Sequence, residues 1–424
     1  SSAASDVYKR QPPEEEDLFI DMHSEEYCGM ISRSLLQLGN PYRIRKAIEK
    51  SKAGKEVTLA YIGGSITQGA GAIPIHTECY AYKSFQLFQN RFSTQNNVRF
   101  IKAGVGGTPS ELGMIRFDRD VLREGERPDI VVIEFAVNDE GDETKGVCYE
   151  SLVRKVLKLP WKPAVVLLFS VFANDWNLQE RLRPVGDLYD LPMVSIRDAV
   201  TPQFSLKCGE GRILSKNQFF YDIFHPNNTG HTIMADCLQY LFERCDAAEP
   251  ARVGTFVEGM TEEQILSEKL FGPAVIGADF ERIFLLDKKN RYVGAKIRTG
   301  SFTSTDIELQ SVEMDGSLTQ TPEFPYNWMY DGSRPQMPGF EMEITCKSLF
   351  LIFKDSGEMD VGKADVFVND VYCMTADPHK NNWLHCNAVL LFWETESRSH
   401  KVRITVTEED QNKKFTILGF GYTI

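Results

Sequence analysis

The feature that most constrains the fold is a series of short apolar runs that alternate with helical segments between residues 57 and 244. The runs at residues 129–135 (DIVVIEF) and 164–170 (AVVLLFS) are almost continuously apolar, as strands are when helices cover both faces of a sheet. Further strands are expected at residues 57–62, 97–102 and 192–196, and helices at 24–51, 81–92, 112–122, 149–159, 178–188 and 229–244. This alternation predicts an α/β domain with a parallel sheet between two layers of helices.

The chain changes character after about residue 273, where short runs of alternating apolar and polar residues begin. Such runs lie at residues 340–344, 348–353, 364–368, 388–392, 401–406 and 415–422. Turn residues separate them, which predicts an all-β, antiparallel sandwich. We therefore expect a disordered tail at residues 1–23, a catalytic domain at 24–250, a linker at 251–275 and the sandwich at 276–424.

Charge and cysteine usage exclude several classes of partner. The net charge is −13, from 60 acidic and 47 basic residues, which disfavours nucleic acid and anionic membrane surfaces. The nine cysteines are scattered without a CxxC pair, and no metal-ligand spacing is present, so neither a metal nor another cofactor is expected. An odd number of scattered cysteines slightly favours a cytoplasmic location, whereas a removed signal peptide would make the protein a secreted one. The sequence leaves the oligomeric state open.

A serine follows the first predicted strand of the sheet. Ser65 stands in the stretch YIGGSITQG, directly after two glycines, which is how a sharp turn can expose a serine hydroxyl at the end of a strand. The stretch predicts a nucleophile. The alternative is a turn whose glycines supply only backbone freedom.

A nucleophilic serine needs a base, which is usually a histidine oriented by a carboxylate. His225 lies in the segment YDIFHPN, three residues after Asp222 and just before the last predicted helix. This spacing lets the carboxylate reach the imidazole within one turn. The alternative is a loop histidine next to a helix start.

Acyl transfer also needs hydrogen-bond donors for an oxyanion. Gly107 follows the second predicted strand and can offer a backbone N–H, and Asn138 follows the third and can offer a side-chain amide. Each could instead be a simple turn residue. Because the carboxyl ends of parallel strands meet at one edge of a sheet, we expect Ser65, Gly107 and Asn138 to converge.

Four short blocks together resemble the SGNH (GDSL-type) hydrolases. They are, in chain order, GGSI at residues 63–66, AGVGGT at 103–108, AVND at 136–139 and DIFHP at 222–226. The resemblance implies a three-layer, flavodoxin-like catalytic domain with Ser65 as nucleophile, His225 as base and Asp222 as its orienting acid. It also implies an oxyanion hole formed by the N–H groups of Ser65 and Gly107 and the amide of Asn138. Two positions depart from the family pattern, since Gly64 replaces an aspartate and Ala136 replaces a glycine.

The variant blocks GGSIT, GVGGT and EFAVND, followed by a jelly-roll-like sandwich, resemble more narrowly the SGNH carbohydrate esterases that deacetylate plant polysaccharides, such as acetyl xylan esterases. An acetylated carbohydrate is therefore the expected substrate, and Gln68 and Trp176 are candidate substrate contacts. The sandwich contains five aromatic residues that could stack on sugars or fill its core: Tyr326, Trp328, Tyr330, Trp383 and Trp393. The alternatives are a lipid or thioester acyl hydrolase and a carbohydrate-binding protein with an idle hydrolase domain.

One charged pair is given a purely structural interpretation. Glu150 and Arg154 are spaced i,i+4 within the predicted helix at residues 149–159. This spacing predicts an ion pair on a solvated helix face.

Overall fold

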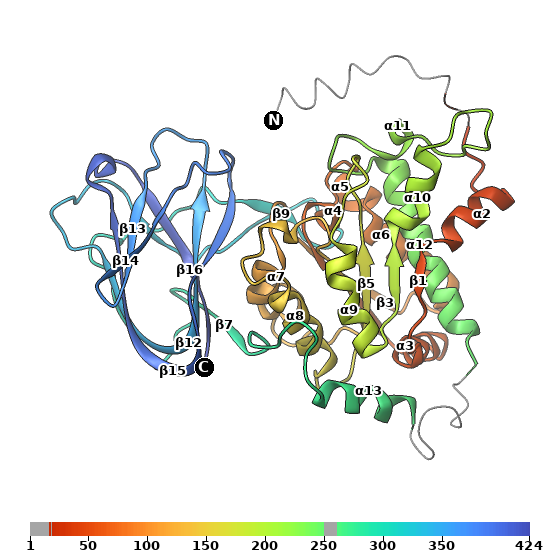
Figure 1. Cartoon of the computed structure of the whole chain (residues 1–424), viewed down its shortest axis with the longest axis horizontal. Coiled ribbons are helices and arrows are strands. Elements are labelled where there is room, and N and C mark those ends of the chain that lie inside the picture. The colour runs from red at the N-terminus through yellow and green to blue at the C-terminus, as the bar shows by residue number, and fades with distance from the viewer. Residues whose placement is uncertain (1–16, 18, 250–260) are drawn as a thin grey trace. The chain divides into compact units, whose positions relative to one another are not determined.

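The structure, a computed structural model, describes residues 17, 19–249 and 261–424. Most of the predicted tail at residues 1–23 and much of the predicted linker at 251–275 lie outside the described residues. The chain divides into two compact units (Figure 1). The first unit comprises residues 1–113, 117–278 and 313–319, and the second comprises residues 114–116, 279–312 and 320–424.

The first unit is built on a six-stranded sheet. Its strand order is β1 (Leu35–Gln37), β6 (Met193–Ser195), β5 (Ala164–Phe169), β4 (Ile130–Glu134), β2 (Val57–Gly63) and β3 (Val98–Gly104). All neighbours are parallel except β1, which runs antiparallel to β6. The α/β class predicted from the apolar runs is therefore confirmed.

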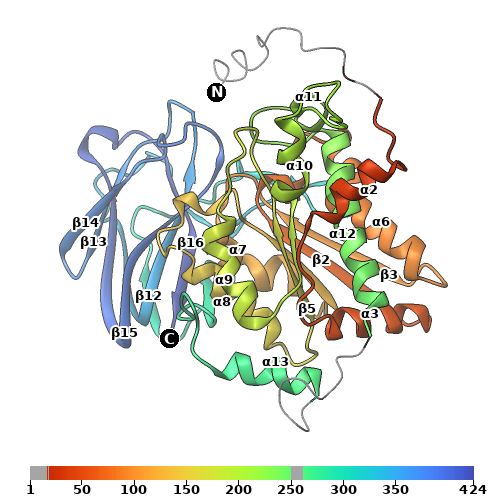
Figure 2. The same cartoon turned by 45° about the vertical axis from the view of Figure 1, so that its right-hand side comes forward.

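Helices cover both faces of this sheet (Figure 2). One layer holds α2 (Glu25–Ser32), α3 (Tyr42–Lys52), α6 (Tyr80–Phe92), α10 (Ile196–Phe204) and α12 (Asn228–Ala247), and the other holds α7 (Ser110–Phe117), α8 (Val147–Leu157) and α9 (Gln179–Tyr189). Shorter helices are α4 (Ser65–Gln68), α5 (Ile75–Glu78), α11 (Lys216–Phe219) and α13 (Glu262–Phe271).

The helix predicted at residues 24–51 is wrong in its middle. The structure has α2, then the short strand β1, then α3. The break has a local cause, because Gly39 has a φ of +59° and Pro41, which has no N–H to donate, stands directly before α3. The helix predicted at residues 112–122 also starts earlier, as α7, and passes into a π-helical turn at Asp118–Leu122.

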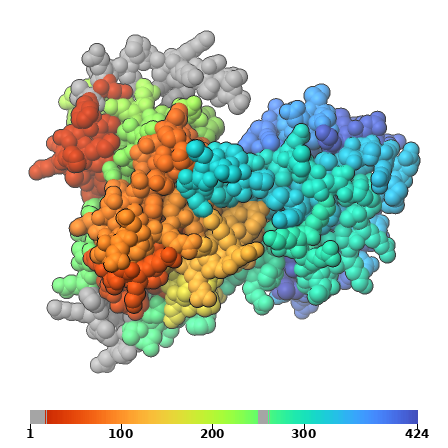
Figure 3. Space-filling view, turned by 180° about the vertical axis from the view of Figure 1, so that it is seen from behind, coloured from red at the N-terminus to blue at the C-terminus, as the bar shows by residue number. Residues whose placement is uncertain are grey.

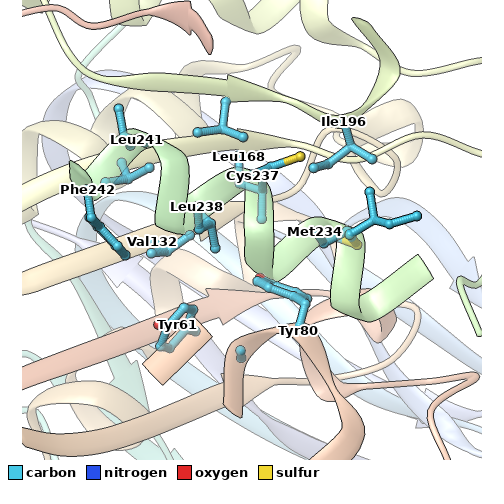
Figure 4. Packing of buried hydrophobic residues seen from close by; sticks show 14 of the residues in the cluster. Tyr61, Tyr80, Val132, Leu168, Ile196, Met234, Cys237, Leu238, Leu241 and Phe242 are labelled. Carbon is cyan, nitrogen blue, oxygen red and sulfur yellow. The ribbon is translucent and has the colours of Figure 1, made fainter. Parts of the chain in front are cut away.

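The core of the first unit lies between the sheet and α12. Met234, Cys237, Leu238, Leu241 and Phe242 are fully buried, which leaves one apolar face of a 20-residue helix against the strands. Figure 4 shows them facing Tyr61 of β2, Val132 of β4 and Leu168 of β5. At about 25 cal/mol per Å² of apolar surface, each such side chain contributes roughly 1.5–3 kcal/mol, which fixes α12 and the loop before it on the sheet.

The edge strand β3 is covered by residues that lie far along the chain. The Asp315 carboxylate accepts the Lys102 N–H at 2.9 Å and pairs with Arg123 at 2.8 Å. Both contacts lie within the first unit. In Figure 3 the segment around Asp315 (cyan) lies against the region of α6 and β3 (orange). A covered edge leaves fewer backbone groups free to pair with another chain.

The predicted surface pair Glu150–Arg154 is instead buried. Glu150 is fully buried on α8 and its carboxylate accepts the Tyr189 hydroxyl at 2.6 Å and the backbone N–H groups of residues 275–277 at 2.5–2.9 Å. Arg154 donates to the same Tyr189 hydroxyl and to the Leu270 carbonyl. The helix face expected in water is thus covered by the segment after α13.

We predict that Glu150→Ala lowers the free energy of unfolding by roughly 2–4 kcal/mol, because buried donors lose their acceptor. Urea denaturation followed by far-ultraviolet circular dichroism measures this loss. The control is Glu180→Ala on α9, whose side chain is 73% exposed and pairs with Arg197. That surface pair should contribute less than about 1 kcal/mol. Equal effects of the two substitutions would contradict the prediction.

The second unit is an antiparallel β-structure, as predicted. Its eight-stranded sheet has the order β11 (Trp328–Tyr330), β16 (Phe415–Thr423), β12 (Phe340–Asp355), β15 (His385–Val406), β13 (Ala364–Val368) and β14 (Val371–Ala376), with β7 (Ile283–Leu286) on β16 and β8 (Ala295–Arg298) on β12. The short strands β9 (Ser311–Glu313) and β10 (Gln320–Pro322) pair with each other.

Two pairs of predicted strands in this unit are single long strands. Residues 340–344 and 348–353 both belong to β12, and residues 388–392 and 401–406 both belong to β15. The pairing of β12 with β15 shifts register between Cys346 and Ser348, and the sequence pattern alone does not distinguish this irregularity from a turn. Of the five aromatic residues named above, Trp328 and Tyr330 are buried, whereas Tyr326, Trp383 and Trp393 are 42–44% exposed.

Candidate active site

Three strands of the first unit end at the same level. In the sheet register Gly63 of β2 lies beside Gly104 of β3 on one side and beside Glu134 of β4 on the other. Ser65, Gly107 and Asn138 follow these three residues by two, three and four positions. The parallel register therefore brings the three predicted residues to one edge of the sheet, where the loops of such folds carry ligand sites.

Ser65 is the first residue of the single-turn helix α4, which packs closely on the strand ends. A Cβ on Gly63 would lie 2.2 Å from Thr67 Oγ1, and a Cβ on Gly104 would lie 2.0 Å from the Gln68 nitrogen. Only glycine fits at these two positions. The turn ends at Gly69, whose φ is +107°.

The loop that carries His225 is closed on itself. The Tyr221 N–H donates to the His225 carbonyl at 2.8 Å, and Phe220 and Pro226 form an isolated β-bridge. Asp222 Oδ1 accepts the backbone N–H groups of Phe224 and His225 at 2.7 and 2.8 Å. The carboxylate is thus held beside the imidazole by the backbone itself.

Contacts between the two loops determine how the serine and the histidine face each other. His231, in the first turn of α12, accepts the Tyr80 N–H on Nδ1 and donates from Nε2 to the Ala70 carbonyl at 3.1 Å. Asn228 exchanges two hydrogen bonds of 2.8 Å with the backbone of Ile73. Burial lowers the pKa of His231 to about 3, so this imidazole is neutral and its hydrogen bonds do not change near neutral pH.

Ser65, His225 and Asp222 come together in a line. Ser65 Oγ lies 2.9 Å from His225 Nε2, and His225 Nδ1 lies 2.9 Å from Asp222 Oδ2. Partial burial would raise the pKa of Asp222, but the hydrogen bonds from the His225 ring and from two backbone N–H groups outweigh it, so that pKa lies below its usual value. Asp222 is therefore a carboxylate at neutral pH, and the imidazole can take a proton from Ser65.

The candidate oxyanion donors lie in the loops that follow β3 and β4. Gln68 Oε1 accepts the Gly106 N–H at 2.9 Å, and Gly107 follows with a φ of +71°. The Asn138 Oδ1 atom is buried and has no hydrogen-bond partner in the described part of the chain. It lies against Gly64, where a Cβ would come within 2.2 Å of it. Gln68 thus contacts the glycine turn itself, and its predicted contact with substrate stays a prediction.

An aromatic row joins Trp176 to the histidine. Trp176 stacks on Phe172 with ring centroids 5.7 Å apart, Phe172 contacts Phe224 edge-on at 5.1 Å, and Phe224 contacts His225 at 6.1 Å. Phe224 is 45% exposed. The row therefore offers apolar surface next to the imidazole.

Three buried polar residues beneath the site were missed by the sequence interpretation. Lys102 Nζ donates to the Gln68 carbonyl at 2.9 Å, and Glu134 accepts hydrogen bonds from Thr67 and Ser170. Lys102, Glu134 and Thr67 have no exposed surface. The available signal was a charged residue at the end of an apolar strand, in RFIK and in DIVVIE, because an unneeded charge is rarely placed there.

One family of known proteins matches a central part of the first unit. Residues 61–233 match the GDSL-like lipase/acylhydrolase family, which confirms the resemblance to GDSL-type hydrolases for this part of the chain. The match supports ester hydrolysis as the class of reaction. No curated protein sequence matches the chain.

Among solved structures, a two-domain esterase active on acetylated mannans is similar over nearly the whole chain. The TM-score is 0.72 at 23% identity, with 92% of this chain and 98% of the other covered. A structure of such an esterase co-crystallised with mannopentaose gives 0.71 at 23% identity, with the same coverage. This similarity establishes a shared fold for both units.

The described residues contain neither a membrane-spanning helix nor a metal-ligating cluster. No helix within them is long and apolar enough to cross a membrane. They also contain no group of three or more His, Cys, Asp or Glu side chains arranged to hold a metal ion.

Proposed function

We propose that the protein is a serine esterase that removes acetyl groups from carbohydrate, such as a plant-type polysaccharide or its oligosaccharides. The observation that carries this proposal is the 2.9 Å distance between Ser65 Oγ and His225 Nε2, with Asp222 on the other ring nitrogen. A serine hydroxyl paired with an imidazole that an ionised carboxylate orients is the arrangement that acyl transfer needs.

The reaction proceeds in two steps. Ser65 Oγ attacks the ester carbonyl while His225 takes its proton, and the oxyanion accepts hydrogen bonds from the N–H groups of Ser65 and Gly107 and from the Asn138 amide. His225 then protonates the sugar oxygen as its bond to the carbonyl carbon breaks, so the sugar leaves as an alcohol and an acetyl-serine remains. Water, deprotonated by His225, attacks that acyl group, and acetate leaves as Ser65 recovers its proton.

Two observations support a carbohydrate substrate. The structural neighbour described above acts on acetylated mannans and shares the fold of both units. The Trp176–Phe172–Phe224 row next to His225 offers an aromatic surface on which a sugar ring can stack. Trp176 is therefore proposed as a substrate contact.

The test is acetate release from a panel of acetylated mannans, xylans and oligosaccharides, together with p-nitrophenyl esters of increasing acyl length. We expect release from at least one acetylated glycan and the highest kcat/KM on the acetyl ester, with a fall of at least about tenfold by the octanoyl ester. A preference for long chains would favour a lipid or thioester acyl hydrolase instead. Failure of a fluorophosphonate to label Ser65 would favour an idle hydrolase domain.

A matched pair of variants tests the aromatic row. Trp176→Ala should raise KM for the acetylated glycan by about tenfold, because stacking of a ring on an aromatic side chain is worth about 1–3 kcal/mol. The same variant should leave kcat/KM for p-nitrophenyl acetate within about threefold of the wild type. Trp161→Ala is the control. The Trp161 indole N–H donates to the Pro128 carbonyl, which precedes β4, whereas the candidate site lies after the end of β4. An unchanged KM in Trp176→Ala would remove Trp176 from the proposed substrate contacts.

A further inference from the structure

A carboxyl group lies buried beneath the nucleophile turn. Glu134 is the last residue of β4 and has no exposed surface. Its carboxylate accepts hydrogen bonds from the hydroxyls of Ser170 and, at 3.1 Å, Thr67. Among the described residues no ion pair includes Glu134. A buried carboxylate without a cation is costly, so a structural role alone would be served as well by an amide.

The hydrogen bonds of Glu134 lead directly to Ser65. Thr67 is the third residue of α4, two positions after the nucleophile, and its hydroxyl also lies 2.8 Å from the Tyr80 hydroxyl. Because α4 has a single turn, holding Thr67 also holds the backbone of Ser65. Thr67 itself fills the space above Gly63, so the turn cannot move toward the sheet.

The charge of Glu134 also acts on His225. Burial raises the pKa of Glu134 to about 7, against the opposing effects of its two hydroxyl donors and of His225. The mutual attraction favours the carboxylate together with the imidazolium. An imidazolium is also the species that His225 becomes when it takes the Ser65 proton.

Burial also shifts the pKa values of other titratable groups near this pair. Tyr80 and Tyr149 are buried, and burial holds their pKa values well above the usual range. Burial likewise raises the pKa of Asp139 well above its ordinary value. His231 stays neutral, and Asp222 stays ionised. Glu134, with a pKa of about 7, can therefore change its charge near neutral pH.

We propose that Glu134 is a positioning residue of the active site: its buried carboxylate holds the nucleophile turn through Thr67 and stabilises the imidazolium form of His225 during acyl transfer. The inference rests on the proposed function, since it needs His225 to act as the base. It adds a second carboxylate to the Ser65–His225–Asp222 group, on the side of the serine rather than behind the histidine.

The test is the pH profile of kcat/KM for p-nitrophenyl acetate in Glu134→Gln. The amide keeps the size and an acceptor for Thr67 but loses the charge. Without the charge the imidazolium is less favoured. We expect the acidic limb to move down by roughly 0.5–1 pH unit and the plateau to fall about three- to tenfold.

Two further variants keep the test decisive if Glu134→Gln folds poorly. Ser170→Ala removes one donor that stabilises the carboxylate, so the limb should move in the same direction by a smaller amount. Glu150→Gln makes the same chemical change at a fully buried glutamate on α8, and it should lower stability while the acidic limb stays in place.

The outcomes separate this inference from the function on which it rests. A wild-type protein with no esterase activity on any ester tested would overturn both. An active wild type whose acidic limb coincides with that of Glu134→Gln and Ser170→Ala would overturn only the role of Glu134. A limb that also moves in Glu150→Gln would mean that any buried glutamate affects the profile, and would likewise overturn it.

Discussion

Replacement of Ser65 by alanine is expected to lower kcat for p-nitrophenyl acetate by about 10⁴-fold or more, because loss of the nucleophile leaves only the oxyanion donors and substrate binding. The physical reason is the loss of the hydroxyl that lies 2.9 Å from His225 Nε2. The fold should survive, since the hydroxyl points toward the histidine and the buried contacts of α4 come from Ile66 and Thr67. The measurement is steady-state hydrolysis, with fluorophosphonate labelling as a second readout.

The control for this prediction is Ser205→Ala. Ser205 lies at the end of α10, is exposed, and its hydroxyl donates only to the Pro202 carbonyl. It should keep wild-type kcat and label at the wild-type rate. Wild-type-like turnover in Ser65→Ala would exclude the two-step mechanism, whatever the acyl group.

Substitution of Gly64 by alanine is expected to lower kcat by about 10²-fold with little change in KM. A Cβ on Gly64 would lie 2.2 Å from Asn138 Oδ1 and 2.6 Å from its Nδ2. The Asn138 amide must then move away from the oxyanion position, and loss of one such donor typically costs 10²–10³ in kcat. An aspartate, which the SGNH pattern has at this position, would need the same displacement.

A double-mutant comparison checks the cause. Asn138→Ala should lose about as much activity as Gly64→Ala, and the double variant should lose no more than either, because both remove the same donor. Gly141→Ala is the matched control, since a Cβ at Gly141 meets no atom within 4 Å and the residue lies three positions after Asn138. Additive losses in the double variant would mean that Gly64→Ala acts on Ser65 instead.

The order of strands and helices could be predicted because the spacing of apolar residues along the chain indicates which face of each element is buried. The runs DIVVIEF and AVVLLFS have no polar face, so they had to be central strands, and four motifs at strand ends or before a helix indicated one edge of the sheet. The boundaries of helices and strands were harder to predict where only one or two residues interrupt an element. Gly39 and Pro41 split one predicted helix, and a register shift at Cys346 inside β12 has the sequence pattern of a turn.

The sequence by itself determined the α/β class, the all-β second unit, and which serine, histidine, aspartate, glycine and asparagine to examine, since strand patterns and motif spacing are local properties. Only the tertiary structure decided the distances among these residues, because residues 65 and 225 are brought together by the contacts of His231 with Ala70 and of Asn228 with Ile73. It also reversed the interpretation of Glu150 and revealed Glu134. Whether a carboxylate faces water or a buried hydroxyl depends on segments distant in the chain, and no local pattern of residues records that.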